Sequence, residues 1–208
     1  MRRNPKIVII DYGIGNTYSV INSIINLGYT NVRVSDKEVE IKSADTIILP
    51  GVGAFDEAVR NLQSHHLLEI LNETVLIKKK PILGICVGMQ LLAEGSFENG
   101  WHQGLNWIPG KVKKLELPPS FAVPHVGWNN ITFNRPDPLF SRTPENPNFY
   151  FDHSYYFETE PEYCLAFCDY GIKVTAAVQK DNIFGVQFHP EKSQTNGLKM
   201  FRGFFNAI

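Results

Sequence analysis

Residues 81–90 of the chain read PILGICVGMQ, the pattern of a strand, a sharp turn and the start of a helix. The apolar run 82–85 predicts a strand that is covered on both faces, because it shows no alternation of polar and apolar side chains. Glycines on both sides of Cys86 predict a sharp turn after the strand, and the residues from Met89 onward predict a helix. A strand that leads through a tight turn into a helix is the repeating unit of α/β proteins.

The same alternation of strands and helices is found toward the N-terminus. Residues 7–10 read IVII, a β-branched run typical of a buried parallel strand, and the helical spacing of apolar residues from 20 to 27 ends at Gly28. This regularity predicts βαβ units, and therefore an α/β fold with a flavodoxin-like, mostly parallel sheet flanked by helices. Further strands are predicted at 32–34 and 46–49, and further helices at 55–62 and 67–77.

The pattern changes from about Trp101, where polar and proline-rich stretches separate short strand-like pieces. Pieces such as 149–151 and 174–178 predict hairpins and antiparallel strands added to the parallel core. Residues 198–205 predict a closing helix. Because the chain has 208 residues, of which 43% are hydrophobic, we expect a single domain over residues 1–208.

Composition narrows the possible partners and compartments. The net charge of −1 argues against nucleic acid or an acidic membrane surface, since both leave a basic footprint on the proteins that bind them. The apolar run 7–10 behind the basic segment 1–6 is too short for a signal peptide, and no run approaches membrane-spanning length. Cys86, Cys164 and Cys168 form neither a disulfide framework nor a zinc spacing. The sequence therefore predicts a cytoplasmic protein without membrane association, metal or other cofactor, in which Cys164 and Cys168 are core residues.

The chemistry of the turn centres on Cys86. Gly84-x-Cys86-x-Gly88 has the pattern of a nucleophile elbow, with cysteine where many hydrolases carry serine. The N-terminal end of the following helix would favour the thiolate form of the sulfur, and the backbone N–H of Val87 would point to a developing oxyanion. The alternative interpretation of the motif alone is a buried core cysteine.

A second segment, residues 184–192, reads FGVQFHPEK and supplies a base and an acid. On extended backbone, residues two apart point to the same side, so His189 and Glu191 are expected to lie side by side, with Pro190 limiting their movement. The carboxylate would then hold the imidazole tautomer while the other ring nitrogen faces the thiol. These residues predict a Cys86–His189–Glu191 triad; the alternative is a surface histidine at the end of an apolar strand.

Two loops offer further polar groups. Residues 50–53 read PGVG, and their backbone could supply a second oxyanion donor or form an ordinary turn. The stretch 149–155 is rich in aromatic residues. Within it we expect His153 to be a hydrogen-bonded structural histidine, whereas Ser154 and Tyr155 could contact the amino and carboxylate groups of a substrate.

Taken together, these motifs resemble the class I, triad-type glutamine amidotransferases. Within that family the chain is most similar to the glutaminase subunits of imidazole glycerol phosphate synthase, from about residue 6 to residue 205. The motifs that carry the resemblance are DYGIGN at 11–16, LPGVG at 49–53, GICVGMQ at 84–90, PHVGWN at 124–129, HSY at 153–155 and QFHPEKS at 187–193.

The resemblance implies a role for each matching residue. Cys86 would attack the carboxamide of L-glutamine, His189 would shuttle the proton and Glu191 would orient His189. A thioester would form, release ammonia and be hydrolysed to glutamate. The family pattern assigns the oxyanion groups to Gly51, Val52, Gly53 and Val87, and the glutamine contacts to Gln90, Ser154 and Tyr155.

The resemblance also implies a partner. In the family, ammonia passes through a tunnel into a (β/α)8-barrel cyclase subunit of a heterodimer. There it reacts with a ribulosyl phosphate intermediate, giving imidazole glycerol phosphate and an aminoimidazole carboxamide ribotide in histidine biosynthesis. Trp128, Tyr150 and Lys192 fall where family members line the subunit interface. Asp152 departs from the family pattern, which has a small apolar residue before His-Ser-Tyr.

Three alternatives stand beside this interpretation. A paralogous branch with the same architecture supplies ammonia for amidination of a surface-sugar precursor. A catalytically silent scaffold protein is another, although scaffolding needs none of Cys86, His189 and Glu191. Some cysteine peptidases use a Cys–His pair on a related fold, but the loop 50–53 and Gln90 favour chemistry on a free amino acid.

Overall fold

The structure is a computed structural model that describes residues 4–207. Met1, Arg2 and Arg3 of the basic N-terminal segment, and Ile208, lie outside the described residues. Within residues 4–207, no helix is both long and apolar enough to cross a membrane.

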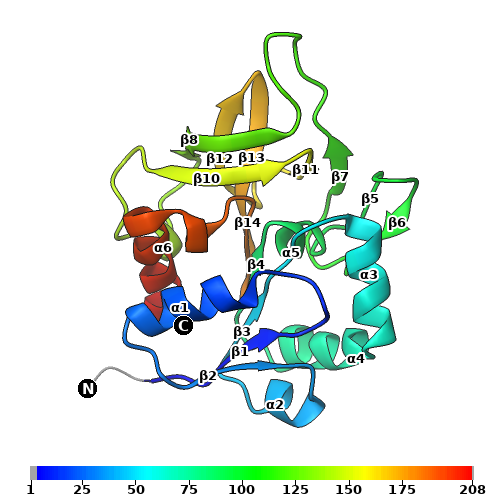
Figure 1. The fold of residues 1–208 in the computed structure, drawn as a ribbon, viewed down its shortest axis with the longest axis vertical. Coiled ribbons are helices and arrows are strands. Elements are labelled where there is room, and N and C mark those ends of the chain that lie inside the picture. The colour runs from blue at the N-terminus through cyan, green and yellow to red at the C-terminus, as the bar shows by residue number, and fades with distance from the viewer. Residues whose placement is uncertain (1–3, 208) are drawn as a thin grey trace.

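The centre of the molecule is an eight-stranded sheet in the order β2-β1-β3-β4-β14-β13-β12-β9 (Figure 1). The first five strands of this order run parallel. Four of them, β1, β3, β4 and β14, are buried at every residue, as expected when both faces of a sheet are covered. Their bounds are β1 Ile7–Ile10, β2 Val32–Ser35, β3 Thr46–Leu49, β4 Ile82–Ile85 and β14 Ile183–Val186.

Helices cover both faces of this sheet. Figure 1 shows α1 (Thr17–Asn26) and α6 (Gln194–Ala207) on one side, and α3 (Phe55–Ser64) and α4 (Leu67–Asn72) on the other. The predicted helix 67–77 is α-helical only as far as Asn72, after which Glu73–Ile77 form a π-helical turn. The short helix α2 (Glu38–Lys42) was not predicted, because five residues are too few for a helical pattern to emerge.

Antiparallel strands extend the sheet and build the upper part of the molecule, as the sequence predicts. β13 (Ile172–Lys180), β12 (Cys164–Tyr170) and β9 (Thr132–Phe133) continue the main sheet beyond β14. Two smaller sheets complete this part. One pairs β8 (His125–Asn130) with β10 (Asn148–His153), and the other joins β11 (Tyr155–Glu158), β7 (Lys111–Lys114), β5 (Gly95–Ser96) and β6 (His102–Gln103).

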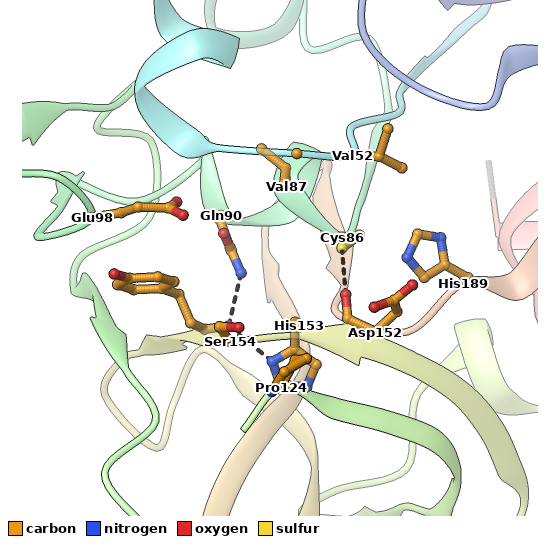
Figure 2. Close-up of a pocket in the computed structure, with 12 residues that line it drawn as sticks. Val52, Cys86, Val87, Gln90, Glu98, Pro124, Asp152, His153, Ser154 and His189 are labelled. Carbon is orange, nitrogen blue, oxygen red and sulfur yellow. Dashed lines mark hydrogen bonds between the residues drawn. The ribbon is translucent and has the colours of Figure 1, made fainter. Parts of the chain in front are cut away.

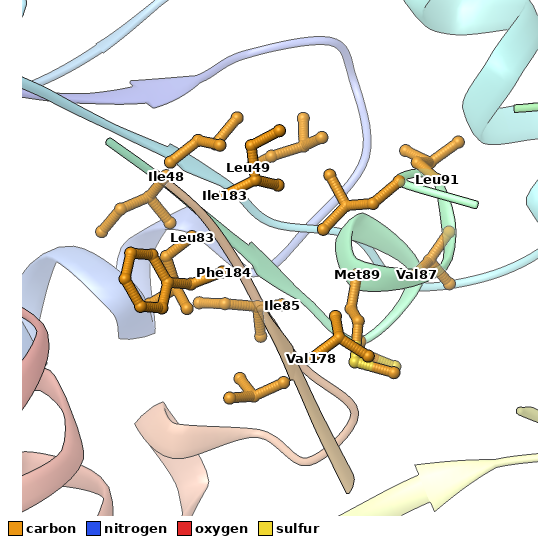
Figure 3. Close-up of a cluster of buried hydrophobic side chains, with 14 of the residues drawn as sticks. Ile48, Leu49, Leu83, Ile85, Val87, Met89, Leu91, Val178, Ile183 and Phe184 are labelled. Carbon is orange, nitrogen blue, oxygen red and sulfur yellow. The ribbon is translucent and has the colours of Figure 1, made fainter. Parts of the chain in front are cut away.

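Core packing holds together β4 and β14, two neighbouring strands of the sheet that are distant in sequence. Figure 3 shows Leu83, Ile85 and Phe184 packed against side chains of neighbouring strands. β4 and β14 pair in register, with Val186 opposite Ile85, although they are about a hundred residues apart in sequence. Since both strands end at the same edge of the sheet, Cys86 and residues 187–189 are brought together.

Candidate active site

Cys86 follows β4 directly and occupies a strained turn. Its φ of 53° and ψ of −111° lie in a region that residues with a Cβ rarely adopt. The flanking glycines are required by close packing: a Cβ on Gly84 would lie 2.5 Å from the Gly88 carbonyl oxygen, and a Cβ on Gly88 would lie 1.9 Å from the Leu49 carbonyl oxygen. The predicted sharp strand-to-helix turn at residue 86 is confirmed.

The helix after the turn is shorter than the sequence suggests. α5 spans only Val87–Gln90, so the prediction of a helix reaching Ala93 is wrong. Residues 91–93 form turns instead, in which the N–H groups of Leu92 and Ala93 donate to the carbonyl groups of Met89 and Gln90. A four-residue helix has little macrodipole. Any polarisation of the sulfur therefore comes from the first N–H groups of the turn and from the side chains around it.

His189 and Glu191 form a buried pair. The His189 Nδ1 atom lies 2.8 Å from the Glu191 Oε1 atom, and the two side chains are 3% and 2% exposed. The extended backbone predicted between them is wrong, because Pro190–Lys192 form a 3₁₀ turn, and this turn returns the carboxylate to the ring. Since a carboxylate can only accept, Nδ1 carries the proton and Nε2 is left free for the sulfur.

Electrostatics favour an imidazolium at this position. Burial on its own lowers the pKa of His189, but the attraction of the Cys86 sulfur and of the Glu191 carboxylate outweighs it and raises the pKa to about 10. Both partners therefore favour the protonated ring. A cation beside the sulfur stabilises a thiolate, which is the nucleophilic form of cysteine.

A cavity of about 270 Å³ opens in front of the sulfur. Figure 2 shows Cys86 and His189 on one side of it and Gln90 and Glu98 on the other. This volume suits a ligand the size of an amino acid. The cavity is lined by Val52, Gly53, Cys86, Val87, Gln90, Glu98, Pro124, Asp152, His153, Ser154, Tyr155 and His189.

The loop after β3 lies against the elbow. A Cβ on Gly51 would lie 2.7 Å from the Gly88 nitrogen, so only glycine allows this approach. The hydroxyl of the buried Tyr12 donates to the Pro50 carbonyl at 2.5 Å and anchors the start of the loop. The two following residues, Val52 and Gly53, reach the cavity.

The comparisons with known proteins agree with this geometry. The family model "Glutamine amidotransferase class-I" matches residues 8–208. The chain belongs to this family. "Imidazole glycerol phosphate synthase subunit HisH 2" of Vibrio vulnificus is 47% identical to this amidotransferase over 203 residues, covering 98% of this chain and 95% of the relative. "Imidazole glycerol phosphate synthase subunit HisH" of Leptospira interrogans is 46% identical over 200 residues, covering 94% and 97%.

Solved structures share the fold of this amidotransferase at low identity. A GMP synthase homologue from Thermoplasma acidophilum has a TM-score of 0.72 at 20% identity, covering 100% of this chain and 95% of that chain. PurLQS from Thermotoga maritima has a TM-score of 0.72 at 16% identity, covering 97% and 98%. The predictions of the fold class and of an enzyme of the glutamine amidotransferase family are confirmed.

Of the predicted substrate contacts, Gln90 is the most constrained in the amidotransferase. Its Nε2 donates to the Tyr155 carbonyl at 2.9 Å and to Gln187 Oε1 at 3.0 Å, so only its Oε1 remains for a ligand. Ser154 and Tyr155 line the same cavity. Two residues around the site were missed in the sequence. Glu98 lines the cavity but sits in a loop without a motif, and Gln187 precedes the better-marked histidine by two positions.

His153 is buried and hydrogen-bonded through both ring nitrogens. Its Nδ1 lies 2.8 Å from the Tyr155 carbonyl, which fixes the proton on that nitrogen, and its Nε2 lies 3.1 Å from His125 Nδ1. Burial lowers the pKa of His125 to about 4 and, with the neighbouring histidines, that of His153 to about 3. The amidotransferase therefore carries a neutral histidine pair behind the cavity.

The three predicted interface residues meet on one surface of the amidotransferase. The rings of Trp128 and Tyr150 lie 6.2 Å apart, and Lys192 Nζ lies 5.4 Å from the centre of the Tyr150 ring. Lys192 also lies 3.9 Å from the Asp152 carboxylate. The Asp152 carbonyl in turn lies 4.0 Å from Cys86 Sγ, so this surface borders the cavity. We call Trp128, Tyr150 and Lys192 the aromatic patch.

Proposed function

We propose that this chain is the glutaminase subunit of an imidazole glycerol phosphate synthase, which hydrolyses L-glutamine to glutamate and ammonia for histidine biosynthesis. Relatives that bear that subunit's name align with nearly the whole chain at up to 47% identity. The catalytic part of this proposal rests on one observation, the buried His189–Glu191 pair beside the Cys86 sulfur. The single domain over residues 1–208 is part of the same proposal.

The first half of the reaction uses the ion pair. The Cys86 thiolate attacks the carboxamide carbon of glutamine, and the carbonyl electrons move to oxygen. Backbone N–H groups of Val87 and of the loop 51–53 stabilise that oxyanion. The tetrahedral intermediate collapses to a thioester as the C–N bond breaks, and the His189 Nε2 proton passes to the nitrogen, which leaves as ammonia.

The second half restores the enzyme. Neutral His189 takes a proton from water as the water oxygen attacks the thioester carbon. The C–S bond then breaks, glutamate leaves, and the thiolate–imidazolium pair forms again. Throughout both halves Glu191 holds the His189 tautomer through the 2.8 Å hydrogen bond.

The shape and charge of the cavity suit free glutamine. Oε1 of Gln90 and the polar groups of Ser154 and Tyr155 are available to its amino and carboxylate ends. Glu98 lies across the cavity from the sulfur, and burial raises the pKa of its carboxyl group. A bound α-ammonium group would offset that burial, and we therefore assign Glu98 to the ammonium end of the substrate.

The acceptor of the ammonia belongs to a partner. We propose a (β/α)8-barrel cyclase subunit that docks on the aromatic patch and forms imidazole glycerol phosphate and an aminoimidazole carboxamide ribotide. The exposed Trp128, packed edge-on against Tyr150, supports this assignment, since aromatic side chains are enriched at interfaces. The short path from the patch to the cavity favours transfer of ammonia within a heterodimer.

The test uses Cys86→Ala in the complex with the cyclase subunit. Glutamine-dependent turnover should fall by at least a thousandfold, while added ammonium still supports the cyclase reaction. Cys164→Ala is the matched control, because Cys164 is a buried free cysteine that does not line the cavity, and it should keep glutamine turnover. Persistent glutamine turnover in Cys86→Ala would exclude Cys86 as the nucleophile.

A growth experiment in cells tests the identity of the ammonia acceptor. With its cyclase subunit, the chain should rescue a histidine auxotroph that lacks its own glutaminase subunit, when ammonium is kept low. An enzyme that hydrolyses glutamine yet fails to rescue growth would instead belong to the branch that amidinates a surface-sugar precursor.

A further inference from the structure

Gln187 is a buried polar residue that the proposed mechanism does not use. Residues 187 and 188 form a bend beyond β14, and the side chains of both Gln187 and His189 contact Cys86. The ring of Phe188, between them in the chain, stacks on Phe149 at 3.9 Å. The side chain of Gln187 is completely buried, and its amide therefore needs partners.

The orientation of the Gln187 amide follows from its neighbours. The Tyr155 carbonyl can only accept a hydrogen bond, so the Gln90 atom 2.9 Å from it must be the amide nitrogen. The same nitrogen lies 3.0 Å from Gln187, and the Gln187 atom that faces it must therefore be the oxygen. The nitrogen of Gln187 is then left to face the Cys86 sulfur, at 3.6 Å.

Two groups favour opposite protonation states of the Cys86 sulfur. The Asp152 carbonyl, at 4.0 Å, accepts from the S–H group and favours the protonated thiol. The Gln187 N–H, at 3.6 Å, gains most when the sulfur is negative, because a hydrogen bond to an ion is about twice as strong as one between neutral groups. The shorter contact is the one that favours the thiolate.

We propose that Gln187 is a positioning residue whose amide N–H, aimed by Gln90, stabilises the Cys86 thiolate and holds the sulfur toward the cavity. The inference rests on the proposed function in taking Cys86 as the nucleophile. Other titratable groups around the sulfur are His189 after β14, Tyr12 after β1, Asp152 and His153 on β10, and Glu98 across the cavity. A substitution of Gln187 leaves all of them in place.

The test measures the thiol itself. The rate of alkylation of Cys86 by iodoacetamide is followed against pH by peptide mass spectrometry, which separates it from the two other cysteines. Gln187→Met keeps the side-chain length and removes the donor, so the profile should move to higher pH by about one unit. Thr175→Val is the matched control: it removes one buried polar group from the adjacent β13, and its profile should match wild type. An unshifted profile for Gln187→Met overturns the proposal.

A second measurement needs no change at position 187. In the ¹⁵N-labelled wild-type chain, the side-chain amide signals of Gln187 should move with pH through the same transition as the alkylation rate. In Cys86→Ala these signals should be constant over that range. If they are constant in wild type as well, the role of Gln187 is excluded, whereas loss of glutamine turnover in Cys86→Ala would still support the proposed function.

Discussion

At the scale of single residues, the site depends on a strained cysteine that its neighbours hold in place. A left-handed φ at a residue with a Cβ costs on the order of 1–2 kcal/mol. The turn persists because the backbones around Cys86 are packed too closely to relax, with Gly88 against the end of β3. The turn therefore holds the buried sulfur at the wall of the cavity.

Gly88→Ala tests this packing. Gly88 has no left-handed φ, so alanine there is disfavoured only by the 1.9 Å approach of its Cβ to the Leu49 carbonyl oxygen. We expect a loss of about 3 kcal/mol or more in the free energy of unfolding, measured by denaturant titration. Gly100→Ala is the control, since that site has a φ of 104° and open space, and it should lose only about 1 kcal/mol. Equal losses would mean that the elbow is not tightly packed.

At the scale of elements, the pairing of β4 with β14 explains why two distant motifs could be predicted to meet. Each motif follows an apolar run, and parallel strands end at the same edge of a sheet, so Cys86 and His189 converge once the two strands are neighbours. The exact backbone could not be predicted, because the 3₁₀ turn at Pro190–Lys192 and the four-residue α5 are too short to leave a periodic pattern. Glu98 was missed because a contact across 43 residues, to the Phe55 N–H, holds it at the site.

The histidine pair that links β8 and β10 predicts acid sensitivity. The pKa values of His125 and His153 are lowered to about 4 and about 3 in the folded protein. As the pH falls below about 6.5, these two histidines are therefore protonated in the unfolded chain before they are protonated in the folded one. The stability from these neutral rings is complete above that pH and is lost on acidification. In His125→Phe, a phenyl ring replaces the imidazole between Phe151 and Tyr170. The decrease in the free energy of unfolding between pH 7 and pH 5 should then be roughly halved, because one of the two histidines no longer titrates.

Urea titrations across this pH range measure the effect. His102→Phe on β6 is a suitable control, because His102 lies outside the pair, and its pH dependence should follow that of wild type. If His125→Phe has the same dependence as wild type, the pair does not govern acid unfolding.

At the scale of the whole molecule, the cavity lies between the ends of the parallel strands and the part built by the added strands, and that part carries most of the aromatic patch. Figure 1 shows β8 and β10 beyond the edge at which β4 ends, so this small sheet lies over the carboxyl ends of the parallel strands. Trp128 comes from β8, Tyr150 from β10 and Lys192 from the 3₁₀ turn that carries Glu191. A partner bound there would contact the same elements that position His189 and Glu191.

Two tryptophans test where that partner docks. Trp128 is 45% exposed in the aromatic patch, and Trp101 is 49% exposed where it packs on Phe97, away from the patch residues. Because large aromatic side chains often dominate binding energy, Trp128→Ala should raise the Kd of the complex with the proposed cyclase subunit by about tenfold or more, while Trp101→Ala leaves it unchanged. Titration calorimetry with both variants gives the answer. The reverse pattern would place the interface on the Trp101 side instead of the aromatic patch.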